Sequence, residues 1–420
     1  MTSRPKPRGE GADDSSGSAA TAHGDVGSAP RGRWLLQTLR SWGTIAFLGV
    51  LPVVITIVLI GTVLHNGRRS DFATFWDSGR AVLHGVSPYP DVASLPRAAD
   101  RDSFSPFVYP PPTAFLMVPF SLLPFPVANV FFLLLNLGCV ALSLRLLGVR
   151  DWRCYGAAFL AAPVFAAASI GTISPLLLLG VAAAWRYRER ALVVGMVIAG
   201  VVAMKLFLWP LWFWLIRARH RAAAVLATAS IVATTLLAWW AIGFAGLHDY
   251  PRLLGRLTEL VGVNSYSLYA LQRTAGVSSH AAQAGLILLG LLLVLAAAIA
   301  FGRPRDETRL FVALLGIALV ATPILWPHYL VLLFVPVALS SRAFSGLWLL
   351  PLLFRLDSAP WSYGSATRIV PVLVGTVGIV AIALRGRTLT RQSSSASSPA
   401  AAVPGPLGLT RDGNPMRRGC

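Results

Sequence analysis

Charged side chains are scarce in this chain. Only 13% of its 420 residues are Asp, Glu, Lys or Arg, whereas an ordinary soluble domain carries about 25%. Acidic residues are the scarcest, because 17 of them stand against 36 lysines and arginines. The three cysteines, Cys139, Cys154 and Cys420, form neither a disulfide framework nor the spacing of a metal site. The composition therefore excludes an ordinary soluble domain and a disulfide-rich secreted one.

The signatures of several catalytic classes are also absent. The sequence contains no P-loop, no GxGxxG nucleotide site, no HExxH and no Ser–His–Asp signature. Asp100-Arg101-Asp102 spells the Asp-x-Asp pair that can hold a metal in nucleotide-sugar enzymes, but Arg97 and Arg101 stand beside it in a polar stretch. That setting favours a solvated loop. We therefore expect no metal site and no cofactor.

Apolar residues, in contrast, are abundant and continuous. They make up 55% of the chain, and the mean hydropathy is +0.65. Leu, Ala and Val recur in runs close to the roughly 17–25 residues that a helix needs to cross a bilayer. The runs are continuous rather than alternating, which favours helices over a β-barrel. The sequence predicts an all-α integral membrane protein.

The polar segments set the expected organisation. We expect disordered cytoplasmic tails at 1–41 and 386–420 around one membrane domain, 42–385. In the first outer loop, 65–125, the stretch 110–125 is apolar but broken by prolines, which favours a re-entrant or juxtamembrane helix. About 12 membrane spans are expected: 42–64, 126–147, 154–170, 174–185, 191–204, 206–216, 222–246, 280–302, 308–325, 328–340, 344–355 and 366–385.

The basic residues give the orientation of these spans. Short cytoplasmic loops of membrane proteins carry an excess of Lys and Arg. With both termini in the cytoplasm, the outer connections of similar length hold few basic residues, namely Lys205 and then Arg355 and Arg368 around the last loop. The inner loops hold many: Arg150 and Arg153; Arg186, Arg188 and Arg190; Arg217, Arg219 and Arg221; Arg303, Arg305 and Arg309; and Arg342.

Candidate functional residues gather on the outer side. They include Asp71 after the first span, Lys205 between two apolar runs and His328 at a span end, with Asn264 and Arg273 in an outer loop. Asp71 could instead be a helix N-cap, Lys205 could extend to the interface, and His328 could belong to an aromatic belt. A charge at bilayer depth costs about 2.5–3.5 kcal/mol on insertion scales. Convergence on one side favours a shared site.

These residue types suit a transfer reaction at a membrane surface. A carboxylate such as Asp71 can act as a general base toward an acceptor hydroxyl. Cations such as Lys205 and Arg273 can stabilise the charge that develops on a phosphate leaving group. A transporter or flippase of a lipid-linked saccharide would also gather polar residues, but near the midplane and often in two repeated halves. A non-catalytic membrane scaffold is the third alternative.

Several motifs then resemble glycosyltransferase family 87 of the GT-C superfamily. That family includes polyprenol-phosphate-mannose-dependent α-mannosyltransferases such as the mycobacterial phosphatidylinositol-mannoside mannosyltransferase. The resemblance covers about residues 40–390. The motifs that carry it occur in family order: Asp71-Phe72-Ala73-Thr74-Phe75-Trp76-Asp77 with Gly85-Val86-Ser87-Pro88-Tyr89, Tyr109-Pro110-Pro111, Lys205-Leu206 with Pro210-Leu211, Asn264-Ser265-Tyr266-Ser267-Leu268 with Arg273, and Pro323-Ile324-Leu325-Trp326-Pro327-His328.

The resemblance implies a GT-C helical bundle and an inverting transfer without a metal. Mannose, or another hexose, would pass from a polyprenyl-phosphate donor to a lipid or glycan hydroxyl at the extracytoplasmic face of the cell membrane. Asp71 and His328 would be the catalytic residues, with Asp71 as the base. The implied partners are the donor, a glycolipid or glycan acceptor and membrane lipids, not nucleic acid. The implied residues for binding donor phosphate and substrate are Lys205, Arg273, Asn264, Ser265, Tyr109 and Trp326.

Overall fold

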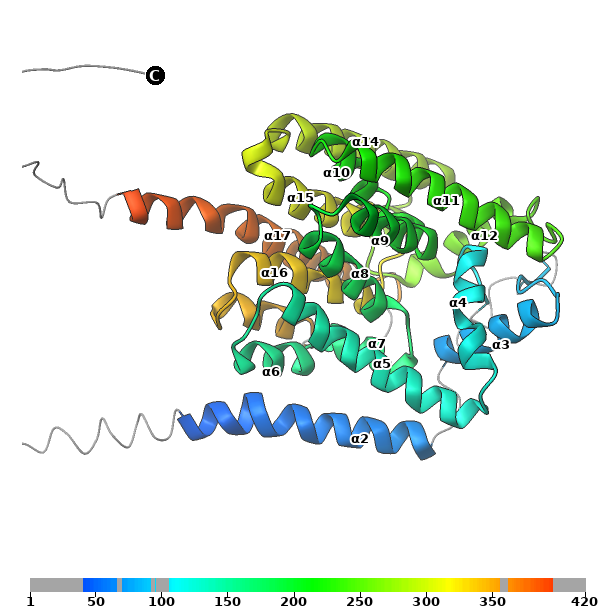
Figure 1. Ribbon diagram of the computed structural model, residues 1–420, viewed down its shortest axis with the longest axis horizontal. Helices are drawn as coiled ribbons and strands as arrows, with labels where there is room; N and C mark the ends of the chain where they lie inside the picture. The colour runs from blue at the N-terminus through cyan, green and yellow to red at the C-terminus, as the bar shows by residue number, and fades with distance from the viewer. Residues whose placement is uncertain (1–40, 66–69, 92–94, 96–105, 356–361, 396–420) are drawn as a thin grey trace, which may run out of the picture. The chain divides into compact units, whose positions relative to one another are not determined.

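Helices make up all the regular structure in the described part of this computed structural model, which comprises residues 41–65, 70–91, 95, 106–355 and 362–395 (Figure 1). Most of both expected tails and the Asp100-Arg101-Asp102 stretch lie outside these residues. The chain divides into Met1–Ala46 and Phe47–Cys420, and the fold below is that of the second unit. Its α-helices are α2 Leu51–His65, α3 Ser70–Leu83, α4 Pro111–Ser121, α5 Phe125–Leu146, α6 Trp152–Leu160, α7 Ala162–Ile170, α8 Ser174–Arg186, α9 Ala191–Met204, α10 Pro210–Arg217, α11 Arg221–Ala241, α12 Tyr250–Val261, α13 Leu268–Thr274, α14 Ser279–Phe301, α15 Glu307–Val320, α16 Phe334–Ser340 and α17 Ala366–Ser395.

Shorter helical turns join these elements. A π-helical turn, η1 Ala46–Val50, precedes α2. The 3₁₀ segments are η3 Leu206–Leu208, η4 Gly262–Asn264, η5 Pro304–Asp306, η6 Pro327–Leu333 and η7 Gly346–Arg355. Most of them begin at or next to a proline or follow a non-helical residue, so they mark places where an α-helix cannot continue.

Five helices of the described residues are long and apolar enough to cross a membrane. They are Ser41–His65, Phe125–Leu146, Arg221–Ala241, Ser279–Phe301 and Ala366–Arg385. A sixth span is possible if α6 and α7, which meet at a 61° bend, count as one. The expected 12 spans therefore resolve into five or six full-length candidates and several shorter apolar helices. Many of the expected short spans are helices of 7 to 14 residues, or 3₁₀ segments.

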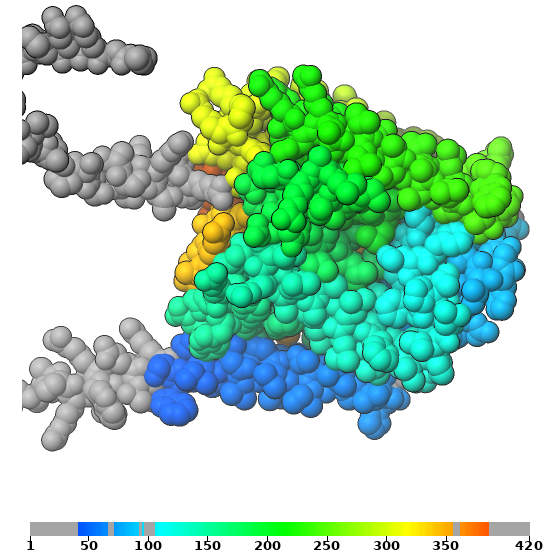
Figure 2. All heavy atoms as spheres, viewed as in Figure 1, coloured from blue at the N-terminus to red at the C-terminus, as the bar shows by residue number. Residues whose placement is uncertain are grey.

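Apolar side chains on the surface agree with a membrane setting. Along α2 the exposed fraction is 57% for Val53 and 63% for Ile57, and on α14 it is 64% for Ile287. In Figure 2, α2 forms one edge of the viewed face, with much of its length open. Large exposed apolar surfaces are costly in water, whereas lipid solvates them without penalty. These helices are suited to face hydrocarbon.

The interior is built from aromatic and small side chains. Phe72 of α3 stacks on Phe132 of α5 with ring centres 4.7 Å apart, and Trp214 of α10 meets Phe311 of α15 at the same distance. Helices α3 and α4 pack closely, because a methyl group at Gly79 would lie 2.9 Å from the carbonyl carbon of Met117. This close packing fixes α3, which carries Asp71 in its first turn.

The two ends of the bundle differ in sequence. Figure 1 shows the α5–α6 and α14–α15 turns at one end, and α3, α4 and α12 at the other. The first, which we call the basic end, holds the arginine-rich turns. There His220 lies 3.0 Å from Glu307 and so joins the α10–α11 turn to the start of α15. The second, which we call the motif end, holds α3, α4, α12 and segments 106–110, 262–267 and 321–329.

Candidate active site

A cavity of about 1040 Å³ lies at the motif end. Five of the eight residues expected at the site line it: Asp71, Tyr109, Lys205, Trp326 and His328. The rest of the lining is mostly apolar and comes from α3, α7, α10, α12, α14, α15, η3, the end of η7 and segment 106–110. A polar cluster inside a largely apolar cavity is the usual form of a small-molecule or lipid site.

Interruptions of helices place backbone and side chains around this cavity. Helix α9 ends at Met204, and Lys205 follows in an extended conformation, with φ −145° and ψ 103°. Pro210 begins α10, and its ring prevents the preceding turn from continuing as one α-helix. Residues 321–326 are likewise non-helical before Pro327. Such backbone is tolerated at membrane depth where it lines a cavity.

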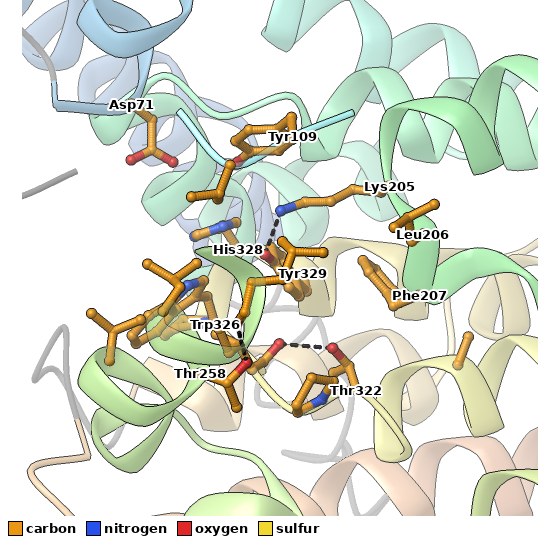
Figure 3. A pocket seen from close by; sticks show the side chains of 18 of the residues that line it. Asp71, Tyr109, Lys205, Leu206, Phe207, Thr258, Thr322, Trp326, His328 and Tyr329 are labelled. Carbon is orange, nitrogen blue, oxygen red and sulfur yellow. Dashed lines mark hydrogen bonds between the residues drawn. The ribbon is translucent and has the colours of Figure 1, made fainter. Parts of the chain in front are cut away.

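Lys205 is held by two tyrosines. Its ammonium donates a hydrogen bond of 2.5 Å to the hydroxyl oxygen of Tyr329 (Figure 3). The same nitrogen lies 4.0 Å from the ring centre of Tyr109 and 4.6 Å from that of Tyr329. Phe207 stacks on Tyr329 at 5.1 Å and supports its ring. These contacts fix the ammonium beside aromatic faces, where cation–π attraction partly offsets its lost hydration.

Asp71 and His328 complete the polar cluster. The carboxylate of Asp71 and the imidazole of His328 both interact electrostatically with Lys205. His328 is only 5% exposed, and its ring lies edge-on to Tyr329 with centres 4.7 Å apart. Figure 3 shows Asp71, Tyr109, Lys205, His328 and Tyr329 grouped in one part of the cavity. A carboxylate, a cation and an imidazole thus come from three separate segments.

The two aspartates of helix α3, Asp71 and Asp77, lie on different faces of the helix. Phe72 and Phe75 are fully buried and anchor the helix, while Asp71 and Thr74 line the cavity. Asp77 stands six residues after Asp71, which corresponds to a rotation of about 240° on a helix of 3.6 residues per turn. It is exposed and does not line the cavity. The helical geometry therefore distinguishes two chemically identical residues that the sequence places side by side.

The remaining three expected residues, Asn264, Ser265 and Arg273, do not line the cavity. The carbonyl of Asn264 accepts a hydrogen bond of 2.8 Å from the Ser362 backbone. Ser265 donates 2.7 Å to the Gly262 carbonyl. Arg273 donates through a terminal guanidinium nitrogen to the Val277 carbonyl at 2.5 Å. These bonds stabilise the loop itself.

That loop supports the segment that carries Trp326 and His328. The Tyr266 backbone nitrogen donates 2.8 Å to the Leu325 carbonyl. The hydroxyl of Ser267 donates 2.8 Å to the Pro323 carbonyl and also accepts from the Ala270 nitrogen, so it caps α13. The Asn264–Leu268 motif therefore holds the backbone of a cavity wall, three and five residues before His328.

A second motif supports Tyr109 in the same way. The Tyr89 hydroxyl donates 2.8 Å to the Tyr109 carbonyl, and the Tyr250 hydroxyl donates 3.1 Å to the Val108 carbonyl. Burial raises the pKa of both hydroxyls above their usual value, and for Tyr89 the nearby Tyr250 adds to the effect. Both therefore stay protonated donors. Ser87 adds a bond of 3.2 Å to the Ala245 carbonyl.

Within the described residues, no three His, Cys, Asp or Glu side chains come together as a group that could hold a metal ion. The polar groups that line the cavity include the carboxylate of Asp71, the imidazole of His328 and the cations of Lys205 and Arg355, within a largely apolar enclosure.

Comparison with known proteins assigns the chain to a family. The model of glycosyltransferase family 87 matches residues 107–327, slightly more than half of the chain. The chain belongs to glycosyltransferase family 87. No curated protein and no solved structure matches it.

The matched region of this family 87 glycosyltransferase contains Tyr109, Lys205 and Trp326, and ends one residue before His328. Asp71 precedes it, so the case for Asp71 rests on the cavity that it lines together with them.

The sequence interpretation missed the role of Tyr329 and the apolar part of the cavity. Tyr329 directly follows His328, and its pairing with Lys205 spans 124 residues, a contact that no local pattern encodes. Leu254 and Leu257 of α12 line the cavity, while Arg252 on the same helix is exposed. Their spacing is that of an amphipathic helix, a signal that could have indicated a wall of the site in this glycosyltransferase.

Proposed function

We propose that this glycosyltransferase transfers a hexose, mannose in our assignment, from a polyprenyl-phosphate sugar to a hydroxyl of a lipid or glycan, with inversion. The reaction takes place at the outer face of the cell membrane. One observation carries the proposal: Asp71, Lys205 and His328 meet in one largely apolar cavity. A lipid-linked sugar phosphate needs such a combination of an apolar enclosure, a cation and a base.

Asp71 acts as the general base in this proposal. Its carboxylate takes the proton of the acceptor hydroxyl as that oxygen attacks the anomeric carbon of the donor sugar. The bond from the anomeric carbon to the phosphate oxygen breaks, and polyprenyl phosphate leaves with the electron pair. Attack opposite the leaving group inverts the anomeric configuration. A positioned base of this kind contributes about 10²–10⁴-fold.

Lys205 stabilises the departing phosphate. The negative charge on that group grows as the glycosidic bond breaks, and a fixed cation in a water-poor cavity stabilises such charge more than it would in water. Tyr329 and Tyr109 hold the ammonium in place before the substrate arrives. The lysine is thus preorganised, which reduces the entropy lost on binding.

His328 and Trp326 adjoin the same groups. His328 binds the phosphate or assists proton transfer, because its imidazole can donate or accept a hydrogen bond. Trp326 lines the cavity and offers an aromatic face to the sugar. Arg273 has no part in phosphate binding in this assignment, since its guanidinium supports the α13–α14 turn instead. Asn264 and Ser265 act on the loop.

Orientation follows from the two ends of the bundle. The arginine-rich turns gather at the basic end, which belongs in the cytoplasm by the positive-inside rule. The motif end, with the cavity, then faces the opposite side. Both termini are cytoplasmic in this assignment. A polyprenyl-phosphate donor, rather than a nucleotide sugar, suits that compartment because it is carried by the membrane itself.

The test is a transfer assay in membranes. Membranes that contain the protein are incubated with labelled polyprenyl-phosphate-mannose and extracted acceptor lipids, and the labelled product is separated and its anomeric configuration determined. We expect label in the acceptor fraction, dependent on Asp71, with the α-configuration from a β-linked donor. Absence of transfer from every polyprenyl-phosphate sugar, with transfer from a nucleotide sugar, would reject the donor class.

A further inference from the structure

Arg355 is one of the few basic residues beside a short outer connection. The topology otherwise places most arginines of short loops on the inner side. Arg355 is the last residue of η7, and it lines the same cavity as Lys205. A cation that lies in a cavity wall on this side of the membrane indicates a role other than setting the orientation of the protein in the membrane.

The bend between α6 and α7 holds Arg355 in place. The Nε of Arg355 donates 2.7 Å to the Leu160 carbonyl. A continuous helix would satisfy that carbonyl with the Val164 nitrogen, but Val164 bonds the Ala161 carbonyl instead, at 3.1 Å. The guanidinium also lies over the ring of Phe165, 5.4 Å from its centre. One of the five guanidinium N–H donors is thus used, and within the described residues no hydrogen bond engages the two terminal nitrogens, which can bind a ligand.

The surroundings of Arg355 suit a lipid. Phe165 lines the cavity and is 40% exposed, and Leu353 of η7 is 56% exposed. Ala162 and Ala166 stand one turn apart on α7 and line the cavity with small side chains, which leaves room beside the guanidinium. A charged group next to exposed apolar surface is the combination that a lipid headgroup and its chains require.

This edge of the cavity differs from the one near Lys205. At the other edge, Leu206, which follows Lys205 in the chain, is 49% exposed and Leu291 of α14 is 53% exposed, and both line the cavity. Helices α7 and η7 pack against each other, whereas α14 packs against α13 and α15. The cavity therefore has two apolar edges built from different helices, and each edge has its own cation.

We propose that Arg355 binds the phosphate group of a second lipid at the α7–η7 edge, apart from the phosphate site at Lys205. A planar guanidinium can make two parallel N–H···O bonds to a phosphate, a geometry that lysine cannot reproduce. In a sugar transferase two substrates must reach one cavity, and two lipid-facing edges let both arrive from the bilayer. The statement that both lipids are substrates rests on the proposed function, whereas the binding of a lipid phosphate by Arg355 does not.

The experiment measures binding without catalysis. Purified full-length protein in detergent is titrated with dioctanoyl phosphatidylglycerol, with dioctanoylglycerol and with inorganic phosphate, and the thermal midpoint is followed. The variants are Arg355→Gln, Arg355→Lys, Lys205→Met and, as a matched control, Arg368→Gln. Arg368 flanks the same loop but does not line the cavity. Sugar transfer is assayed separately, so failure of the transfer reaction leaves the binding result intact.

We expect the short-chain phospholipid to stabilise the wild type, Lys205→Met and Arg368→Gln alike. Arg355→Gln should lose at least about tenfold in affinity, because hydrogen bonds to a charged group are lost, and Arg355→Lys should recover part of it. Stabilisation by inorganic phosphate alone, with the same dependence on Arg355, would assign the phosphate site to a free ion rather than a lipid.

Three outcomes would overturn the proposal. Undiminished phospholipid binding by Arg355→Gln, together with a lower midpoint in the absence of lipid, would leave Arg355 with only the role of capping Leu160. Loss of binding in Lys205→Met would place the phosphate at Lys205. Equal stabilisation by the uncharged dioctanoylglycerol would show that the α7–η7 edge binds apolar chains and does not recognise the phosphate group.

Discussion

The basic end and the cavity at the motif end differ in the partners of their charged side chains. At the basic end, charges pair with one another near the surface: Arg153 with Asp151 at 2.8 Å, and His220 and Arg188 with Glu307 at 3.0 and 3.8 Å. At the motif end, Lys205 meets a phenol oxygen and two aromatic rings, and within the described residues it forms no salt bridge. The ion pairs of the basic end stabilise the fold, whereas the Lys205 ammonium is positioned to bind an anionic substrate.

The same contrast extends to the backbone. At the basic end Asp151 caps α6 in the ordinary way, by accepting a hydrogen bond of 3.1 Å from the Arg153 nitrogen. At the motif end α9 and α10 are interrupted at Lys205, and η6 begins only after a non-helical stretch. Non-helical backbone is tolerated at membrane depth where it lines a cavity. Substitutions at the two ends should therefore separate loss of activity from loss of stability.

The largest effect is expected for Asp71→Asn. The amide keeps the size of the side chain but removes the basic oxygen, so transfer should fall by about 10²–10⁴-fold. The thermal midpoint should stay close to that of the wild type. The measurement is the transfer rate of purified variants in detergent, with melting to confirm folding.

Asp77→Asn is the matched control, because Asp77 is on the same helix but exposed and away from the cavity. A folded Asp71→Asn enzyme with the wild-type rate would show that Asp71 is not the base. An inactive Asp77→Asn enzyme beside an active Asp71→Asn enzyme would mean that the other carboxylate takes the proton.

Lys205→Met should reduce transfer at limiting donor by about 10²-fold, the scale of losing one charge-stabilising group. Methionine keeps the apolar stem and removes the charge. Lys205→Arg should retain part of the activity, because arginine pairs with phosphate in a different geometry. The kinetics are measured over a range of donor concentrations. Equal rates for the methionine variant and the wild type at limiting donor would rule out the phosphate role.

Tyr329→Phe should have a smaller effect, about tenfold, since one hydrogen bond to a charged group is lost. Phenylalanine keeps the stacking on Phe207 and the aromatic face beside the ammonium. The loss should fall mainly on the donor KM, and it should disappear in the Lys205→Met background. A double-mutant cycle measures this coupling. Additive losses would show that Tyr329 acts independently of Lys205.

Asp151→Ala should lower stability by about 1 kcal/mol through the lost cap and leave the transfer rate unchanged. The hydrogen bond from Arg153 holds the pKa of Asp151 at about 2, below its ordinary 3.8. Since the folded-state pKa is lowered, the stabilisation is complete above about pH 4 and declines as the pH falls toward 2. Melting from pH 7 to pH 3 checks this. A difference between wild type and variant that widens on acidification would contradict it.

The last comparison concerns the membrane side and should not change activity at all. In a Cys420→Ser background, cysteines at the exposed positions Val86 and Ala275 should react with an impermeant thiol reagent in intact cells. A cysteine at Ala222, near the basic end, should react only after permeabilisation. Labelling of the Ala222 position in intact cells would contradict the proposed orientation of the basic end toward the cytoplasm.

The sequence predicted the long helices well, because a continuous apolar run determines a span by itself. The expected 126–147 and 280–302 correspond to Phe125–Leu146 and Ser279–Phe301. The short elements were predicted less well. The expected span 154–170 is a pair of helices bent by 61°, and 328–340 begins as a 3₁₀ segment. Such interruptions depend on partners far along the chain, which a local hydropathy pattern does not contain.

The candidate site shows the same limit. Asp71, Lys205 and His328 were expected to be close from the charge asymmetry, and they line one cavity. A motif does not distinguish a residue that contacts substrate from one that supports the wall. Ser265 and Arg273 were both expected to bind substrate, but neither lines the cavity, and they donate hydrogen bonds to the carbonyls of Gly262 and Val277. That distinction requires the three-dimensional hydrogen-bond pattern.

Gly79 shows how far from the chemistry the cost of a change can arise. It lies eight residues after Asp71 on α3, roughly 12 Å along the helix axis. A methyl group there would meet the Met117 backbone at 2.9 Å, and backbone cannot rotate aside as a side chain can. Helix α3 would have to tilt, and the tilt would displace its first turn, which carries Asp71. A Gly79→Ala substitution would therefore lower activity as a substitution in the active site does, although residue 79 does not contact the sugar.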